Sequence, residues 1–115
     1  MQQQRRAPRI QPFVVPCRYV LGQQRIPGFL TEIGTAGGRV HTELEPPAVG
    51  TNLVLEARFG RQATHVRIPG IVRWAHASPR GGFLFGMSFE EISPDAQKIV
   101  DGVVEEFRRR AAQIR

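Results

Sequence analysis

Two stretches of strict alternation between apolar and other residues constrain the fold of this chain more than any other feature. Each places every second side chain on one apolar face: Leu53, Leu55, Ala57 and Phe59 in residues 52–59, and Phe83, Phe85, Met87 and Phe89 in residues 83–89. Successive side chains of a β-strand point to opposite sides, so a period of two predicts half-buried strands. Both stretches are therefore predicted to cover a hydrophobic core with one face.

Four further runs are predicted to be strands, because they are rich in β-branched and aromatic residues and end at turn signals. They span residues 13–21, 25–33, 38–43 and 64–77. Pro16 favours an edge position or a bulge in the first run, and the Pro69-Gly70 pair predicts a bend or bulge in the last. Six short antiparallel strands within residues 12–92 indicate a barrel or a sandwich.

The hydrophobic period changes from two to 3.6 near Ser93, which predicts a C-terminal helix over residues 93–111. Ser93 is a suitable N-cap, and Pro94 suits the first helical position. The apolar stripe at helical spacing consists of Ala96, Ile99, Val100, Val103, Val104 and Phe107. The arginines at 108–110 fall in the last turn, where positive charge complements the helix dipole. We expect this helix to lie across one open end or face of the barrel.

The composition indicates one domain with an anionic partner. A chain of 115 residues holds one domain of ordinary size with its own core. The formal net charge is +6 and the pI is near 11.2, which favours nucleic acid, a nucleotide or an acidic protein surface as the partner. No apolar run approaches the roughly 18 residues needed to span a bilayer, and the N-terminus lacks the apolar region of a secretory signal. We therefore expect a cytoplasmic protein without membrane insertion.

No arrangement of residues supports catalysis or metal binding. The sequence contains no serine, histidine and acid constellation, no HExxH motif and no P-loop. His41, His65 and His76 are scattered along the predicted strands, where each is typical of a surface or half-buried residue. Cys17, the single cysteine, lies in an apolar run and indicates a buried structural thiol. We expect a protein that is not an enzyme and has no metal or cofactor.

Arginine is concentrated near the start of the chain, where Arg5, Arg6 and Arg9 fall within five residues ahead of the first predicted strand. Residues 1–11 show no periodicity and are predicted to form a flexible leader. A second unusual stretch is the glycine-rich turn at residues 32–38, which joins two predicted strands. Taken alone, the leader is typical of a solvated tail and the turn is typical of a tight turn that requires positive φ.

The order of these features resembles that of the PilZ family, bacterial receptors for the second messenger cyclic di-GMP. The arginine leader is followed by two strands, the glycine-rich turn, further strands, Gly-Ile-Val-Arg-Trp at residues 70–74, Gly-Met-Ser-Phe at residues 86–89 and a terminal helix. The resemblance covers roughly residues 5–107. It implies a mostly β fold, a six-stranded antiparallel β-barrel with a C-terminal α-helix, and a binding function.

The resemblance also implies a role for the leader. Arg5 and Arg9 match the RxxxR motif of the family, with Arg6 beside them. In this role their guanidinium groups bind phosphate oxygens and the O6/N7 edge of guanine, for which a planar fork is suited. The predicted ligand face further includes Arg39, Trp74 and Gly86.

The turn departs from the second motif of the family, which runs Asp or Asn, any residue, Ser, two residues, Gly. These places hold Glu32, Gly34 and Gly37. Glu32 keeps a carboxylate that can accept from guanine N–H groups, but Gly34 has no hydroxyl. Loss of the serine contact costs ~0.5–1.5 kcal/mol, and a displaced carboxylate acceptor costs a further ~1.5–3 kcal/mol. The resemblance thus implies binding that is weakened or specialised rather than abolished.

These observations predict a cyclic di-GMP receptor that signals to a downstream protein partner by ordering its arginine leader on the ligand. An alternative is a degenerate PilZ domain that does not bind the nucleotide and acts as a protein–protein interaction module, for example in motility. Glu32 and Gly34 favour that alternative. A small-barrel nucleic-acid binder draws on net charge alone, and the lack of an aromatic stacking motif argues against it.

Overall fold

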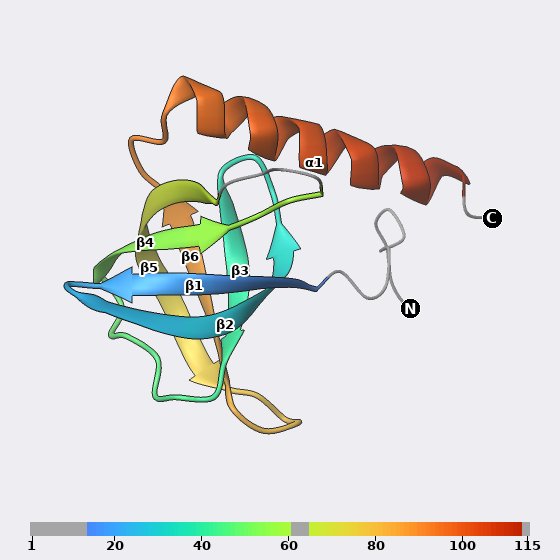
Figure 1. The fold of residues 1–115 in the computed structure, drawn as a ribbon. Coiled ribbons are helices and arrows are strands. Elements are labelled where there is room, and N and C mark those ends of the chain that lie inside the picture. The colour runs from blue at the N-terminus through green and yellow to red at the C-terminus, as the bar shows by residue number, and fades with distance from the viewer. Residues whose placement is uncertain (1–13, 61–64, 114–115) are drawn as a thin grey trace.

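The computed structural model describes residues 14–60 and 65–113, and in it a single β-barrel carries one long helix (Figure 1). The predicted leader, residues 1–11, lies outside the described residues. The elements in chain order are β1 (Val15–Leu21), β2 (Gln24–Ile33), β3 (Gly37–Thr42), β4 (Asn52–Ala57), β5 (Val66–Ala77), β6 (Phe83–Phe89) and α1 (Pro94–Gln113).

The six strands form a closed barrel in the order β1-β2-β3-β6-β5-β4, and every neighbouring pair is antiparallel. Closure depends on the pairing of β1 with β4, from Cys17 opposite Ala57 to Val20 opposite Val54. β1 is therefore not an edge strand. Pro16 is tolerated because it lies one residue before this pairing begins. The predicted fold class, a six-stranded antiparallel barrel with a C-terminal helix, is confirmed.

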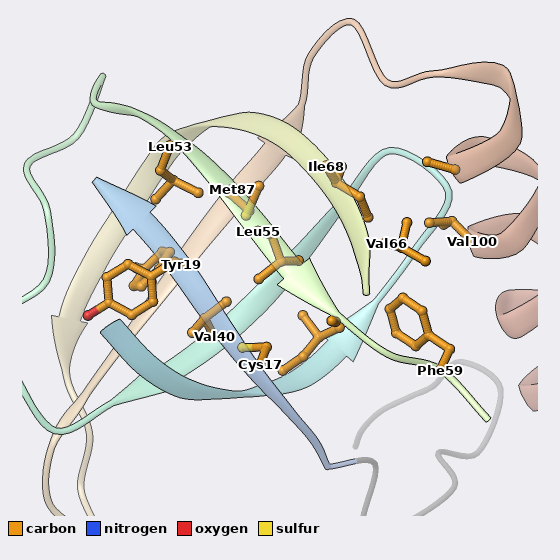
Figure 2. Packing of buried hydrophobic residues seen from close by; sticks show 14 of the residues in the cluster. Cys17, Tyr19, Val40, Leu53, Leu55, Phe59, Val66, Ile68, Met87 and Val100 are labelled. Atoms are coloured by element: carbon orange, nitrogen blue, oxygen red, sulfur yellow. The ribbon is translucent and has the colours of Figure 1, made fainter. Parts of the chain in front are cut away.

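The core fills the interior of the barrel, and the alternating stretches supply much of it (Figure 2). The predicted inner face of residues 52–59 is buried at all four positions. The rings of Tyr19 and Phe85 meet edge to face with centroids 5.1 Å apart, and the Tyr19 hydroxyl is 2.7 Å from Thr42 Oγ1, so the one buried phenol has a hydrogen-bond partner. Burial raises the pKa of the Cys17 thiol to about 12, which agrees with an unreactive structural cysteine.

Helix α1 lies across one end of the barrel, as expected (Figure 1). Its N-cap is Ser93, whose Oγ accepts a hydrogen bond from the Ala96 N–H at 3.1 Å. Ala96 and Val100 of the predicted stripe are buried against the core, and Figure 2 shows Val100 beside Val66. Among the described residues, no helix is long and apolar enough to cross a membrane.

Candidate ligand-binding site

Four residues from four strands form one row across the outer surface of the barrel. Glu32 of β2 pairs with Arg39 of β3, Arg39 pairs with Gly86 of β6, and Gly86 pairs with Trp74 of β5. Their positions in the sequence do not indicate this alignment, because it depends on the register of three separate strand pairs. The row brings a carboxylate, a guanidinium, a glycine without a side chain and an indole into one line.

A bulge in β2 turns Glu32 outward. Leu30 is fully buried, and strict alternation would place Glu32, two residues later, inside the barrel as well. The register between β2 and β3 shifts between Leu30 and Glu32, so Thr31 is an extra residue in the strand. As a result, the Glu32 side chain is about half exposed, at 49%.

A second bulge does the same for Trp74 in β5. Val72 is fully buried, whereas Trp74 is 39% exposed, because the register with β6 shifts between these two residues. The sequence predicted a bend or a bulge at Pro69-Gly70, and a bulge at that place was wrong. The ladder with β4 runs through both residues without a shift, and the extra residue of β5 is Arg73. The two bulges therefore aim Glu32 and Trp74 at the same outer face.

The absence of a side chain at Gly86 makes room for the Trp74 indole. A Cβ atom at Gly86 would lie 2.1 Å from Trp74 Nε1, so the indole lies directly against the Gly86 backbone. The ring also stacks on His76, with centroids 5.0 Å apart and planes 18° apart. Trp74 thus has a fixed orientation and a partly exposed aromatic surface, which is the kind of surface on which a nucleobase stacks.

The glycine-rich turn is held by the barrel and by the helix. The Gly34 N–H donates to the Gly37 carbonyl at 2.8 Å, the Phe89 N–H donates to the Ala36 carbonyl at 2.8 Å, and Gln97 Nε2 of α1 donates to the Thr35 carbonyl at 3.1 Å. These three bonds fix the turn from within, from β6 and from α1.

Taken alone, the turn is typical of a tight turn that requires positive φ, but no residue of the turn has positive φ. Gly37 is required for another reason. A Cβ atom at Gly37 would lie 2.4 Å from the Met87 carbonyl oxygen, so the close approach of β3 to β6 excludes any side chain there. Gly34 is different, since the nearest atom to a Cβ atom built on it is 3.8 Å away.

Residues of the row and of the turn line an open pocket of about 460 Å³. Every predicted site residue that the structure describes lines this pocket: Glu32, Gly34, Gly37, Arg39, Trp74 and Gly86. The predicted leader residues Arg5, Arg6 and Arg9 lie outside the described residues. The structure thus brings together all of the predicted site that it describes.

Arg39 is the central cation of the pocket. Its Nε donates to Thr31 Oγ1 at 3.0 Å, and its Nη1 is 3.7 Å from Glu32 Oε1. The bulged Thr31 therefore orients the guanidinium, whose side chain remains 30% exposed. A guanidinium held in this way retains donors for a phosphate oxygen.

Arg73 and Ser88 also line the pocket, and neither was among the predicted site residues. Arg73 Nε donates to Ser88 Oγ at 2.8 Å, and Arg73 Nη2 is 3.3 Å from Glu90 Oε2. Both lie in stretches that the sequence singled out, at 70–74 and 86–89. Their outward orientation depends on the β5 bulge and the β6 register, for which the sequence carries no local signal.

The described residues hold no group of three or more histidine, cysteine, aspartate or glutamate side chains that suits a metal ion. The pocket instead combines two guanidinium groups, one carboxylate, one hydroxyl, an indole and exposed glycine backbone. This set of groups suits an anionic ligand that also carries a flat ring.

The comparisons with known proteins place the chain in a family. The sequence profile of the PilZ domain matches residues 3–106, so the chain belongs to the PilZ domain family. A search of curated proteins found no significant match.

Two solved structures share the fold. The Bacillus subtilis inhibitor of motility MotI/DgrA superposes with a TM-score of 0.73 at 18% identity, over 97% of this chain and 53% of that protein. The PilZ domain of Escherichia coli YcgR, solved with cyclic di-GMP, superposes with a TM-score of 0.63 at 15% identity, over 92% of this chain and 96% of that domain. The chain thus spans about half the length of the motility inhibitor, and at these identities the likeness establishes the fold alone.

Proposed function

We propose that this protein is a non-enzymatic, cytoplasmic receptor for cyclic di-GMP, and that the pocket beside the Glu32–Trp74 row is the barrel half of its site. The observation that carries the proposal is that six residues predicted from the PilZ pattern line one pocket, although they come from four strands and a turn. Membership of the PilZ domain family and the presence of cyclic di-GMP in the YcgR domain structure support it.

The ligand has two guanine rings and two phosphate groups, and the pocket offers a group for each. The Trp74 indole provides a stacking surface for a guanine ring. Arg39 and Arg73 present guanidinium donors to phosphate oxygens. The Glu32 carboxylate accepts from the N–H groups on the guanine edge, and the backbone at Gly37 allows the ligand to approach closely.

Arg5, Arg6 and Arg9 complete the proposed site from the leader. In the proposed mechanism, the RxxxR arginines bind phosphate and guanine while the ligand occupies the barrel pocket. The leader is ordered on the ligand, which changes the surface offered to a downstream protein partner.

Isothermal titration calorimetry with cyclic di-GMP tests this function. The wild type should bind, and Arg9→Ala should weaken binding about ten- to hundredfold, because a charge-assisted contact contributes ~1.5–3 kcal/mol. The matched control is Arg109→Ala, which removes an equal charge from the α1 surface, where Arg109 pairs with Glu106 at 2.9 Å. Absence of binding heat from intact wild type at protein concentrations on the order of tens of micromolar would contradict the proposal.

A second candidate is an interaction module that no longer binds the nucleotide. Two observations favour it. Gly34 supplies no hydroxyl, and the Glu32 carboxylate lies 3.7 Å from Arg39, so this guanidinium competes with a ligand for it. In that case a partner protein binds equally well with and without cyclic di-GMP, and Gly34→Ser restores no nucleotide affinity.

A further inference from the structure

The side of the barrel formed by β1 and β4 lies opposite the β3–β6 side that carries the ligand pocket, because these pairs are separated by one strand in each direction around the closed sheet. Two rows of paired residues cross it. The first row runs Pro27, Arg18, Glu56 and Arg67. The second runs Arg25, Val20, Val54 and Pro69. We call these two rows the arginine face.

Glu56 is the one carboxylate in these rows, and it is only 4% exposed. Arg25 Nε lies 3.3 Å from Glu56 Oε1, and Arg67 Nη1 pairs with Glu56 Oε2. Both arginine side chains nevertheless remain 54% exposed. Glu56 therefore orients two guanidinium groups without being available to a partner itself.

Arg18 adds a third exposed guanidinium group, which lies 3.5 Å from the ring of His65. A single arginine would neutralise Glu56. The three arginines of the face therefore leave an outward excess of positive charge, and this excess is presented on a rigid sheet rather than on a chain end.

An open groove of about 520 Å³ adjoins these arginines. Val20, Val54 and Pro69 contribute apolar surface to it, and its charged lining residues are Arg67, Glu90 and Glu91. None of the described residues that line the groove is aromatic. Single-stranded nucleic acid is usually held by stacking on aromatic rings, whereas arginine beside aliphatic surface is typical of a protein interface.

We propose that the arginine face forms a docking surface for an acidic, partly apolar segment of a partner protein. Acidic side chains of the segment pair with Arg18, Arg25 and Arg67, and its apolar side chains cover Val20 and Val54. The segment docks in the absence of the nucleotide.

One ion pair joins the groove to the ligand pocket. Glu90 lines the groove, and its carboxylate is 3.3 Å from Arg73, which lines the pocket. A ligand phosphate that draws Arg73 away from Glu90 exposes a negative charge at the groove and weakens the docking of an acidic segment. This link rests on the proposed function. It is reciprocal, so the docked segment lowers the affinity for the ligand by the same factor by which the ligand lowers the affinity for the segment.

The test uses a short fluorescein-labelled peptide in which glutamate and leucine alternate, and fluorescence anisotropy as the readout. The wild type should bind the peptide, and Arg18→Ala/Arg25→Ala should weaken binding at least about tenfold. Arg67 still pairs with Glu56 in this variant, and thermal melting verifies that the variant is folded. The matched control, Arg108→Ala/Arg109→Ala on α1, should change the affinity by less than about twofold.

Three results overturn the docking surface: no binding to the wild type, an equal loss in both double variants, or equally tight binding of polyglutamate, which has no apolar side chains. A single-stranded oligonucleotide is the further comparison. If it binds more tightly than the peptide, and Arg18→Ala/Arg25→Ala abolishes that binding, the face belongs to nucleic acid and the proposal is overturned.

The link between the two sites is tested separately, because cyclic di-GMP should reduce the affinity for the peptide. If calorimetry shows nucleotide binding and the peptide affinity is unchanged, the link is wrong while the function stands. If the nucleotide does not bind and the peptide does, the function fails while the docking surface stands.

Discussion

The two opposite sides of the barrel are built in different ways. The arginine face lies on strand pairs β1–β2, β1–β4 and β4–β5, whose registers run without a shift. The pocket side lies on β2–β3, β3–β6 and β5–β6, and the first and the last of these pairs each contain a bulge. The regular side presents long side chains, whereas the pocket side leaves backbone partly exposed at Gly34 and Gly37.

The difference shows how one small barrel makes two unlike surfaces. A regular ladder keeps the alternation of the sequence, so every second residue projects outward as a side chain. At the pocket, glycines remove side chains where β3 and β6 meet, and bulges turn a carboxylate and an indole to the rim. The bulged side is therefore the side suited to a small ligand, and the regular side is suited to a protein surface.

The largest expected effect is at Gly37, where the pocket side has no room for a side chain. Gly37→Ala places a methyl group against the Met87 carbonyl, 2.4 Å away, and forces β3 and β6 apart. The free energy of unfolding should fall by about 1–3 kcal/mol in urea denaturation. Gly34→Ala is the control, since its methyl group meets nothing closer than 3.8 Å and should change stability by less than about 0.5 kcal/mol. Equal losses in both variants would show that the close approach is not what requires glycine.

The next effect is at Glu56, which organises the regular side. Glu56→Gln removes the charge from a buried carboxylate that pairs with Arg25 and Arg67, and the free energy of unfolding should fall by about 1–2 kcal/mol. Both arginines are more than half exposed and regain water, which limits the loss. The comparison variant is Glu105→Gln, an exposed i,i+3 partner of Arg108, for which less than about 0.5 kcal/mol is expected. A larger loss from Glu105→Gln would mean that Glu56 is not the anchor of this face.

The smallest expected change in stability, within about 0.5 kcal/mol, comes from Gly34→Ser. The turn has space for the side chain, and the new hydroxyl is placed at the rim of the pocket. Its cyclic di-GMP affinity should rise by up to about tenfold, because one hydrogen bond adds ~0.5–1.5 kcal/mol. Calorimetry on the wild type and the variant measures the change, and an unchanged or lower affinity would show that the hydroxyl does not complete the site.

Much of the fold was predictable because its signals are local. Alternation at 52–59 and 83–89 and the helical stripe from Ala96 each appear within a short window, and Ser93 marks the start of the helix. Such local signals do not predict that the barrel closes, because closure depends on the pairing of β1 with β4 across more than thirty residues of chain.

The candidate site was predictable only as a set of positions. The family pattern identified Glu32, Arg39, Trp74 and Gly86, but their alignment in one row requires three registers and two bulges. A bulge changes which side of the sheet a residue faces, and period-two reasoning places such residues on the wrong side. The arginine face was missed for a related reason, because no short window shows that its arginines surround one buried carboxylate.

The central claim is that cyclic di-GMP binds on the bulged side of the barrel, and amide NMR spectra recorded during a cyclic di-GMP titration test it most directly. The largest shifts should fall on the Glu32, Arg39, Gly86 and Trp74 amides, on residues 34–37 and on the indole N–H of Trp74, the only tryptophan in the chain. Amides of Arg18 and Val54 on the arginine face should move little. Shifts concentrated on the arginine face, or no shifts at saturating ligand, would contradict the account.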